Sequence, residues 1–159
     1  MIKSVPNVVN VGLIGCGSMG SELARAVKRG DAGPASIVGL FDEYTPGRHA
    51  LAEELGAGEG PGPAEFDDVS DLIAHPELDL VIECASQVAV VAHAEAVLSA
   101  GVSMLVMSSG ALTSGDFMRS VSSISAKTGA SIYVPSGAVG GIDTLRAARP
   151  LLESVTIVS

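Results

Sequence analysis

The residues best placed to do chemistry lie near the N-terminus, where an apolar run leads into three spaced glycines. Residues 8–20 read VVNVGLIGCGSMG, and Gly15, Gly17 and Gly20 follow the pattern Gly-x-Gly-x-x-Gly. In such a loop the first glycine makes a tight turn, the second lets the backbone approach a pyrophosphate, and the third lets a helix pack closely on a strand. The N–H groups that follow Gly17 would face the phosphates. The spacing therefore predicts a dinucleotide-binding loop.

A carboxylate stands at the expected place beyond this loop. Asp42 closes a short apolar run at residues 36–41, 22 residues after Gly20. A carboxylate there accepts hydrogen bonds from both adenosine ribose hydroxyls and repels a 2′-phosphate, so NAD is favoured over NADP. Arg48 is close enough in sequence to soften that preference. The alternative interpretation of Asp42 is an exposed turn acid.

Three further turns fall at the carboxyl ends of predicted strands, at residues 85–87, 108–111 and 135–138. In an open α/β sheet these ends line the crevice where ligands bind. Small residues there leave room for a ribose and a nicotinamide, and the Ser and Gln side chains offer hydrogen bonds. The alternative is ordinary strand-to-helix turns with helix N-caps. For Ser86 the two roles are compatible.

The remaining reactive side chains are two cysteines and three histidines. Cys16 and Cys84 would end neighbouring strands, and Cys16 would lie at a helix N-terminus, which lowers a thiol pKa. A redox pair is one interpretation, and small buried filler is the one we favour. His49, His75 and His93 all lie away from the expected nicotinamide, so we interpret them as surface or packing residues. Neither a Ser-His-Asp arrangement nor metal-ligand spacing is visible.

Composition excludes several classes of protein. The 159 residues allow one good core, and 47% of them are hydrophobic. The formal charge is −9 and no basic cluster exists, which argues against nucleic acid as a partner. The longest apolar runs have the length of strands rather than membrane spans. Residues 1–10 lack the pattern of a signal peptide. Together with two cysteines, this predicts a protein of the reducing cytoplasm.

The elements that position these residues alternate between strand and helix. Strands are predicted at 8–14, 36–41, 78–84, 102–107 and 131–134, and helices at 18–29, 47–55, 68–75, 87–100 and 142–148, with one more helix that starts at a capping box of Thr113 and Asp116 and ends at Gly129. This alternation predicts an α/β fold, a Rossmann-type doubly wound, mostly parallel sheet with strand order 3-2-1-4-5-6.

The pattern changes near residue 150. We expect residues 1–150 to form the dinucleotide-binding domain and residues 151–159 to be the first strand of a C-terminal substrate and dimerisation domain that is absent from this sequence. An unpaired strand with an apolar stripe invites edge pairing. We therefore expect residues 153–159 to pair between chains or to be disordered.

Four segments together resemble one family. The stretches GLIGCGSMG, ECASQ, VMSSGAL and YVPSGAVGGIDTLRAA are similar in order and spacing to archaeal and bacterial L-aspartate dehydrogenases, over essentially the whole chain. The resemblance implies NAD(P)-dependent interconversion of L-aspartate with iminoaspartate, or with oxaloacetate and ammonia. It also implies a homodimer at full length. The family places its catalytic histidine in the second domain, so the resemblance assigns no catalytic residue to this chain.

The resemblance does assign cofactor-binding positions. Carried over onto this sequence they are Gly15, Cys16, Gly17, Ser18, Met19, Gly20, Asp42, Ala85, Ser86, Ser109, Gly110 and Ala138. Ser109 stands where a small or apolar residue is expected. Two other interpretations stay open: the cofactor domain of a homoserine or sugar dehydrogenase, and a non-catalytic NAD-sensing or regulatory module. The segment VPSGAVGGID favours aspartate.

Overall fold

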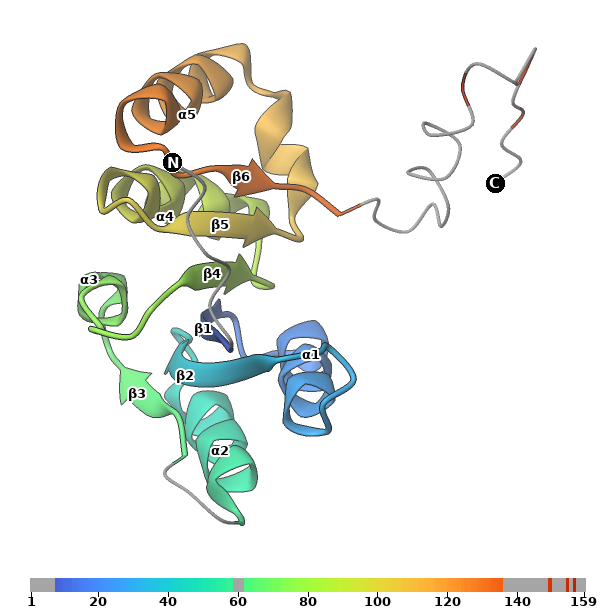
Figure 1. Ribbon diagram of the computed structural model, residues 1–159, viewed down its shortest axis with the longest axis vertical. Coiled ribbons are helices and arrows are strands. Elements are labelled where there is room, and N and C mark those ends of the chain that lie inside the picture. Colours follow the sequence, from blue (N-terminus) through green and yellow to red (C-terminus); the bar gives the residue numbers. More distant parts are fainter. Residues whose placement is uncertain (1–7, 59–61, 136–148, 150–153, 155, 157–159) are drawn as a thin grey trace.

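A parallel sheet organises the chain. The structure, a computed structural model, describes residues 8–58, 62–135, 149, 154 and 156. Within them six strands form a sheet of order β3-β2-β1-β4-β5-β6, and every neighbouring pair is parallel, which confirms the predicted fold class and order (Figure 1). The strands are β1 (Val9–Ile14), β2 (Ala35–Phe41), β3 (Ala64–Phe66), β4 (Leu80–Glu83), β5 (Ser103–Val106) and β6 (Ile132–Tyr133).

Helices cover both faces of this sheet. They are α1 (Ser18–Lys28), α2 (Thr45–Gly56), α3 (Val69–Ile73), α4 (Gln87–Ser99) and α5 (Gly115–Thr128), with a 3-10 helix η1 (Ser109–Thr113) before α5. Figure 1 shows α1 and α2 on one side of the sheet and α3, α4 and α5 on the other. Within the described part of the chain, no helix is both long and apolar enough to span a membrane.

Each face of the sheet has its own hydrophobic core, because neighbouring strand residues point to opposite faces. In β1, Leu13 packs with α1 and α2, whereas the next residue, Ile14, packs with α3, α4 and α5. In β4, Ile82 and Val81 divide in the same way. A strand buried on both faces needs apolar residues at neighbouring positions, and this explains the apolar runs in the sequence.

Three local expectations are wrong or incomplete. Thr113 does not cap α5: its hydroxyl donates to the carbonyl of Gly110 inside η1, and Ser114 is the N-cap instead. The spacing of Met19, Leu23 and Val27 predicts that all three share the apolar face of α1, but Met19 is 61% exposed beside the glycine loop. The bounds of β3 are not predictable from the sequence, because three residues are too few to show a period.

Some expectations fall on residues outside the described ones. These are the helix at 142–148, most of the strand at 153–159 with its edge pairing, and the cofactor position Ala138. They remain predictions, as does the domain boundary at residue 150.

Candidate functional site

The glycine loop between β1 and α1 is tightly packed at two of its three glycines. Gly15 has φ +97°, and a Cβ there would lie 2.7 Å from the backbone nitrogen of Ala85, in the turn after β4. A Cβ at Gly20 would overlap the carbonyl oxygen of Gly15. The chain's own packing therefore requires both glycines, and this packing seats the loop on the neighbouring turn.

Gly17 differs from the other two glycines. Its φ is −70°, which any residue adopts, and a Cβ there would meet no atom within 4 Å. Nothing within the described residues explains the missing side chain, whereas a pyrophosphate that must approach the backbone closely does explain it. Gly17 therefore leaves open a space of the kind that a dinucleotide would occupy.

Backbone donors point to the same region. The first intrahelical hydrogen bond of α1 runs from the N–H of Ser21 to the carbonyl of Gly17, at 2.9 Å. The N–H groups of Ser18, Met19 and Gly20 therefore precede the helical ladder and have no acceptor within it. Such groups at a helix N-terminus bind anions, in agreement with the predicted phosphate contacts.

Asp42 is held in a fixed position beside the loop. Its Oδ2 accepts from the N–H of Cys16 at 2.6 Å, and its Oδ1 accepts from the N–H of Tyr44 at 2.7 Å. Each carboxylate oxygen can accept a second hydrogen bond, so both remain able to bind a ribose hydroxyl. Asp42 is thus more than an isolated turn acid, because it links the end of β2 to the glycine loop.

A pocket of 430 Å³ brings several predicted residues together. Its lining includes Gly15, Phe41, Asp42, Ala85, Ser86 and His93. It therefore combines the turns after β1, β2 and β4 at the carboxyl edge of the sheet. His93 lies on α4 with its ring edge-on to that of Phe41, at 5.7 Å between ring centroids. It is a packing residue, as predicted, but one that lines this pocket.

Arg48 has a different role from the predicted one. Its side chain is 6% exposed, and its guanidinium donates to the carbonyl of Phe66 at 2.5 Å and to the carboxylate of Asp67 at 2.6 Å. The hydrogen bond to Asp67 is the largest cause that raises the pKa of the Arg48 guanidinium. Arg48 therefore links α2 to the end of β3. Its guanidinium, the group expected to meet a 2′-phosphate, is already engaged in these hydrogen bonds.

The turn after β4 combines a helix cap with a buried acid. The hydroxyl of Ser86 accepts from the N–H of Ala89 at 3.1 Å, which confirms the predicted cap of α4 and leaves the cofactor role of Ser86 as a prediction. Glu83, which is not among the residues predicted for the site, is fully buried and accepts hydrogen bonds from both this turn and the one after β5. An acid ending the apolar run LVIE was the available signal.

The turn after β5 packs against the turn after β4. A Cβ at Gly110 would lie 2.7 Å from the amide carbon of Gln87, so a larger residue there would have to displace the Gln87 side chain. Ser109, at the start of η1, is exposed and free to meet a ligand. The predicted positions in these two turns, Ala85, Ser86, Ser109 and Gly110, are therefore neighbours at the same edge of the sheet.

The two cysteines are poorly suited to redox chemistry. Burial, followed by the negative charge of Asp42, raises the pKa of the Cys16 thiol to about 12. Burial also raises the pKa of Cys84 to about 11. These effects outweigh the acidifying field of a helix N-terminus, so the thiolate that thiol chemistry needs is scarce. Both residues are free thiols, and the structure supports the buried-filler interpretation.

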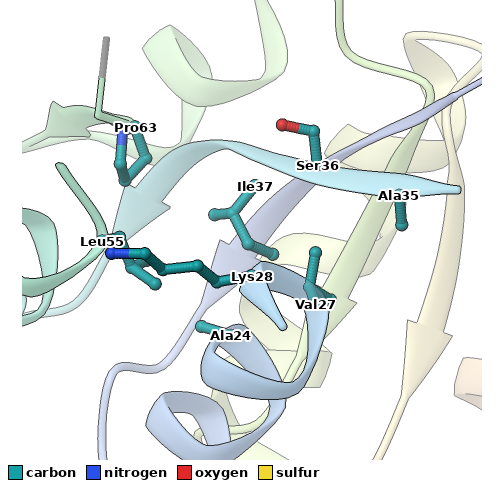
Figure 2. Close-up of a pocket in the computed structure, with 8 residues that line it drawn as sticks. All are labelled: Ala24, Val27, Lys28, Ala35, Ser36, Ile37, Leu55 and Pro63. Carbon is teal, nitrogen blue, oxygen red and sulfur yellow. The ribbon is translucent and has the colours of Figure 1, made fainter. Parts of the chain in front are cut away.

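Two other hollows lie outside the pocket at Asp42. A shallow groove of 620 Å³ runs between α1 and α2 and is lined by the outer side of the glycine loop and by Tyr44. A smaller pocket of 220 Å³ lies at the start of β2, and its lining includes Ser36, Lys28 and Leu55 (Figure 2). The Lys28 ammonium already donates to the carbonyls of Glu54 and Ala57, at 2.7 and 2.8 Å, so it caps the end of α2. The 220 Å³ pocket lies at the start of β2, whereas Asp42 follows the end of this strand.

Comparison with known families identifies this arrangement. The family model described as "Homoserine dehydrogenase, NAD binding domain" matches residues 15–135, which include the glycine loop, Asp42 and the turns after β4 and β5. The chain belongs to this family of NAD-binding domains. The predicted dinucleotide cofactor is thereby confirmed.

Individual relatives are more specific. The L-aspartate dehydrogenase of Archaeoglobus fulgidus is 33% identical over 149 residues, which cover 94% of this chain and 55% of the relative. That of Nitrosopumilus maritimus is 32% identical over 149 residues, covering 94% and 53%. The similarity to L-aspartate dehydrogenases expected from the sequence is confirmed. The chain spans about half the length of these curated relatives.

Solved structures share the fold. An aspartate dehydrogenase from Thermotoga maritima superimposes with a TM-score of 0.61 at 23% identity, over 89% of this chain and 52% of that one. The WlbA dehydrogenase from Bordetella pertussis, solved with NADH and UDP-GlcNAcA, gives a TM-score of 0.71 at 18% identity, over 91% and 42%. At these identities the superpositions support the Rossmann-type fold.

Proposed function

We propose that this NAD-binding domain serves an NAD-dependent L-aspartate dehydrogenase. The observation that carries the binding step is the open space at Gly17, beside a carboxylate held by the loop backbone. The curated relatives named above support aspartate as the substrate. When bound, the nicotinamide would exchange a hydride with the Cα of the amino acid.

The chain's own residues would bind and orient that cofactor. The N–H groups of Ser18, Met19 and Gly20 would hold the pyrophosphate. Asp42 would accept from the adenosine ribose, and the pocket between Phe41 and α4 would take the adenine. The turn at Ser109 and Gly110 would face the nicotinamide half. The described histidines lie on α2, on α4 and in the turn before β4, so we assign none of them to proton transfer.

We further propose that the cofactor is NAD rather than NADP. Asp42 offers two acceptor oxygens to a ribose diol, and a 2′-phosphate would bring like charge against the same carboxylate. Titrating wild type with NADH and NADPH should give the lower Kd for NADH. Asp42→Ser should lower the ratio of the Kd for NADPH to the Kd for NADH about tenfold. Glu77→Gln, which removes an exposed acid at the opposite end of the sheet, should leave this ratio unchanged. Equal wild-type affinity for both cofactors would refute the assignment.

The substrate is tested by turnover. A full-length protein that carries this domain should oxidise NADH only when oxaloacetate and ammonia are both present. We expect the 159-residue chain by itself to bind NADH but to react at least about 100-fold more slowly, as when a general acid is missing. Turnover of aspartate semialdehyde instead would favour the homoserine-type alternative, which the description of the matching family supports. NADH binding without turnover at full length would favour a sensing module.

Assembly and location complete the proposal. We propose a homodimer at full length, to be checked by light scattering on the full-length protein. We also propose a cytoplasmic location, which the two free thiols support. Secretion of the native protein into an oxidising compartment would contradict it.

A further inference from the structure

An unusual charged group lies inside the sheet. Glu83 ends β4, an otherwise apolar strand, and its side chain has no exposure to solvent. Burying a carboxylate is strongly unfavourable unless hydrogen bonds from the protein replace those that water makes to it. An apolar residue at the same position would avoid that cost, so the presence of a carboxylate there requires an explanation.

The hydrogen bonds of Glu83 all come from two turns. Its Oε1 accepts from the N–H of Ala85 at 2.7 Å and from the hydroxyl of Ser108 at 2.8 Å. Its Oε2 accepts from the N–H of Ser108 at 3.0 Å. Three donors converge on this side chain, and only a carboxylate offers two oxygens that both accept hydrogen bonds and donate none. One residue thus ties the turn after β4 to the turn after β5.

These two turns support the rest of the crevice. The backbone of Ala85 is also the surface on which Gly15 of the glycine loop packs. Ser108 directly precedes Ser109 and Gly110, and Gly110 packs against Gln87 from the turn after β4. A shift of either turn would change the distance between the adenosine side and the nicotinamide side of the crevice.

We propose that Glu83 is a positioning residue for the cofactor. Its carboxylate sets the spacing between the turn that lines the adenosine pocket and the turn that faces the nicotinamide half. The inference rests on the proposed roles of these turns in binding the dinucleotide. It predicts that Glu83 matters most for ligands that span both turns, and less for ligands that touch only one.

The substitution Glu83→Gln tests this prediction at constant size. A glutamine offers a single acceptor oxygen, so in either orientation its NH₂ group faces a backbone N–H, that of Ala85 or that of Ser108. We expect the Kd for NADH to rise about tenfold and the Kd for AMP to rise less than about threefold, as one unmatched backbone N–H would produce. Circular dichroism and a urea titration establish that the variant is folded at the assay temperature.

A matched control is available on α4. The carboxylate of Glu95 also accepts from a serine hydroxyl, that of Ser120 at 2.5 Å, but at an exposed site. Glu95→Gln should leave both dissociation constants unchanged. If Glu83→Gln fails to fold, Ser108→Ala replaces it, because this variant removes one donor and keeps the carboxylate; its Kd for NADH should rise about threefold, with AMP unchanged.

Several outcomes would overturn the proposal. Equal changes for NADH and AMP, or no change for either, would show that Glu83 serves stability alone. Hydrogen exchange provides an independent readout: the amides of Ala85 and Ser108 should be protected in wild type, and one of them should exchange at least tenfold faster in Glu83→Gln. Rapid exchange of both in wild type would refute the linkage. A wild type that binds no dinucleotide would instead refute the proposed function, and the inference with it.

Discussion

Gly17 allows binding and folding to be separated by a single methyl group. A Cβ at this position would meet no atom of the described chain within 4 Å, and its φ of −70° suits alanine. A pyrophosphate on the N–H groups of α1 would occupy that space. Gly17→Ala should therefore impair the cofactor site while the fold stays intact.

The expected effect on stability is small because two terms oppose each other. Alanine restricts the unfolded chain, which stabilises a protein by about 0.4–1 kcal/mol where its backbone conformation fits. Alanine is also a poorer N-cap than glycine, and this costs about 0.5–1 kcal/mol. The free energy of unfolding should then stay within about 1 kcal/mol of wild type. The Kd for NADH should rise at least about thirtyfold, which corresponds to about 2 kcal/mol.

Gly20→Ala is the matched counterpart. Its Cβ would overlap the carbonyl oxygen of Gly15, so the helix must move away from the loop. Forced overpacking of this kind costs about 3 kcal/mol. Urea titrations followed by circular dichroism suit a chain without tryptophan, and the fluorescence of NADH reports binding. Wild-type affinity for NADH in a folded Gly17→Ala variant would refute the assignment of this space to a pyrophosphate.

Three further predictions concern other side chains. Arg48→Met should lower the free energy of unfolding by about 2 kcal/mol, because the carbonyl of Phe66 and the carboxylate of Glu65 lose their donor; an unchanged urea midpoint would contradict the link between α2 and β3. Cys16, with its pKa raised to about 12, should be alkylated at pH 8 at least about 100-fold more slowly in the native protein than in urea, as mass spectrometry can measure; equal rates would show an accessible thiolate. Glu65 raises the pKa of His49 above its ordinary 6.5, so the stability that His49 contributes is complete below pH 6.5 and is lost as pH rises through the folded pKa. The difference in urea midpoint between wild type and His49→Gln should therefore shrink from pH 6 to pH 8, and a constant difference would contradict the pairing.

Much of the fold was predictable because its signals are local. Strands buried on both faces, such as β1 and β4, carry apolar residues at neighbouring positions, and a glycine such as Gly129 at φ +79° marks a helix end. The glycine loop and Asp42 were predictable for a similar reason, since a tight turn and a ribose contact need particular residues at a fixed spacing.

What could not be predicted depends on contacts between distant residues. Whether Arg48 reaches a phosphate or the carbonyl of Phe66 depends on where β3 lies, and β3 has only three residues. The role of Glu83 depends on a serine 25 positions later in the sequence. The N-cap of α5 is Ser114 and not the predicted Thr113, because Thr113 belongs to a 3-10 helix that precedes α5. Such a short 3-10 helix has no clear period in the sequence.

The crevice has a consequence for how the domain folds. Its parts come from β1, β2, β4 and β5, so residues between Gly15 and Gly110 must all be in place before a complete site exists. A ligand that binds only this assembled state adds its binding energy to the whole domain, about 2.7 kcal/mol when its concentration is 100 times Kd. Cofactor supply would then set the lifetime of the folded protein as well as its activity. A destabilised variant would survive where NAD is plentiful and be lost where it is scarce.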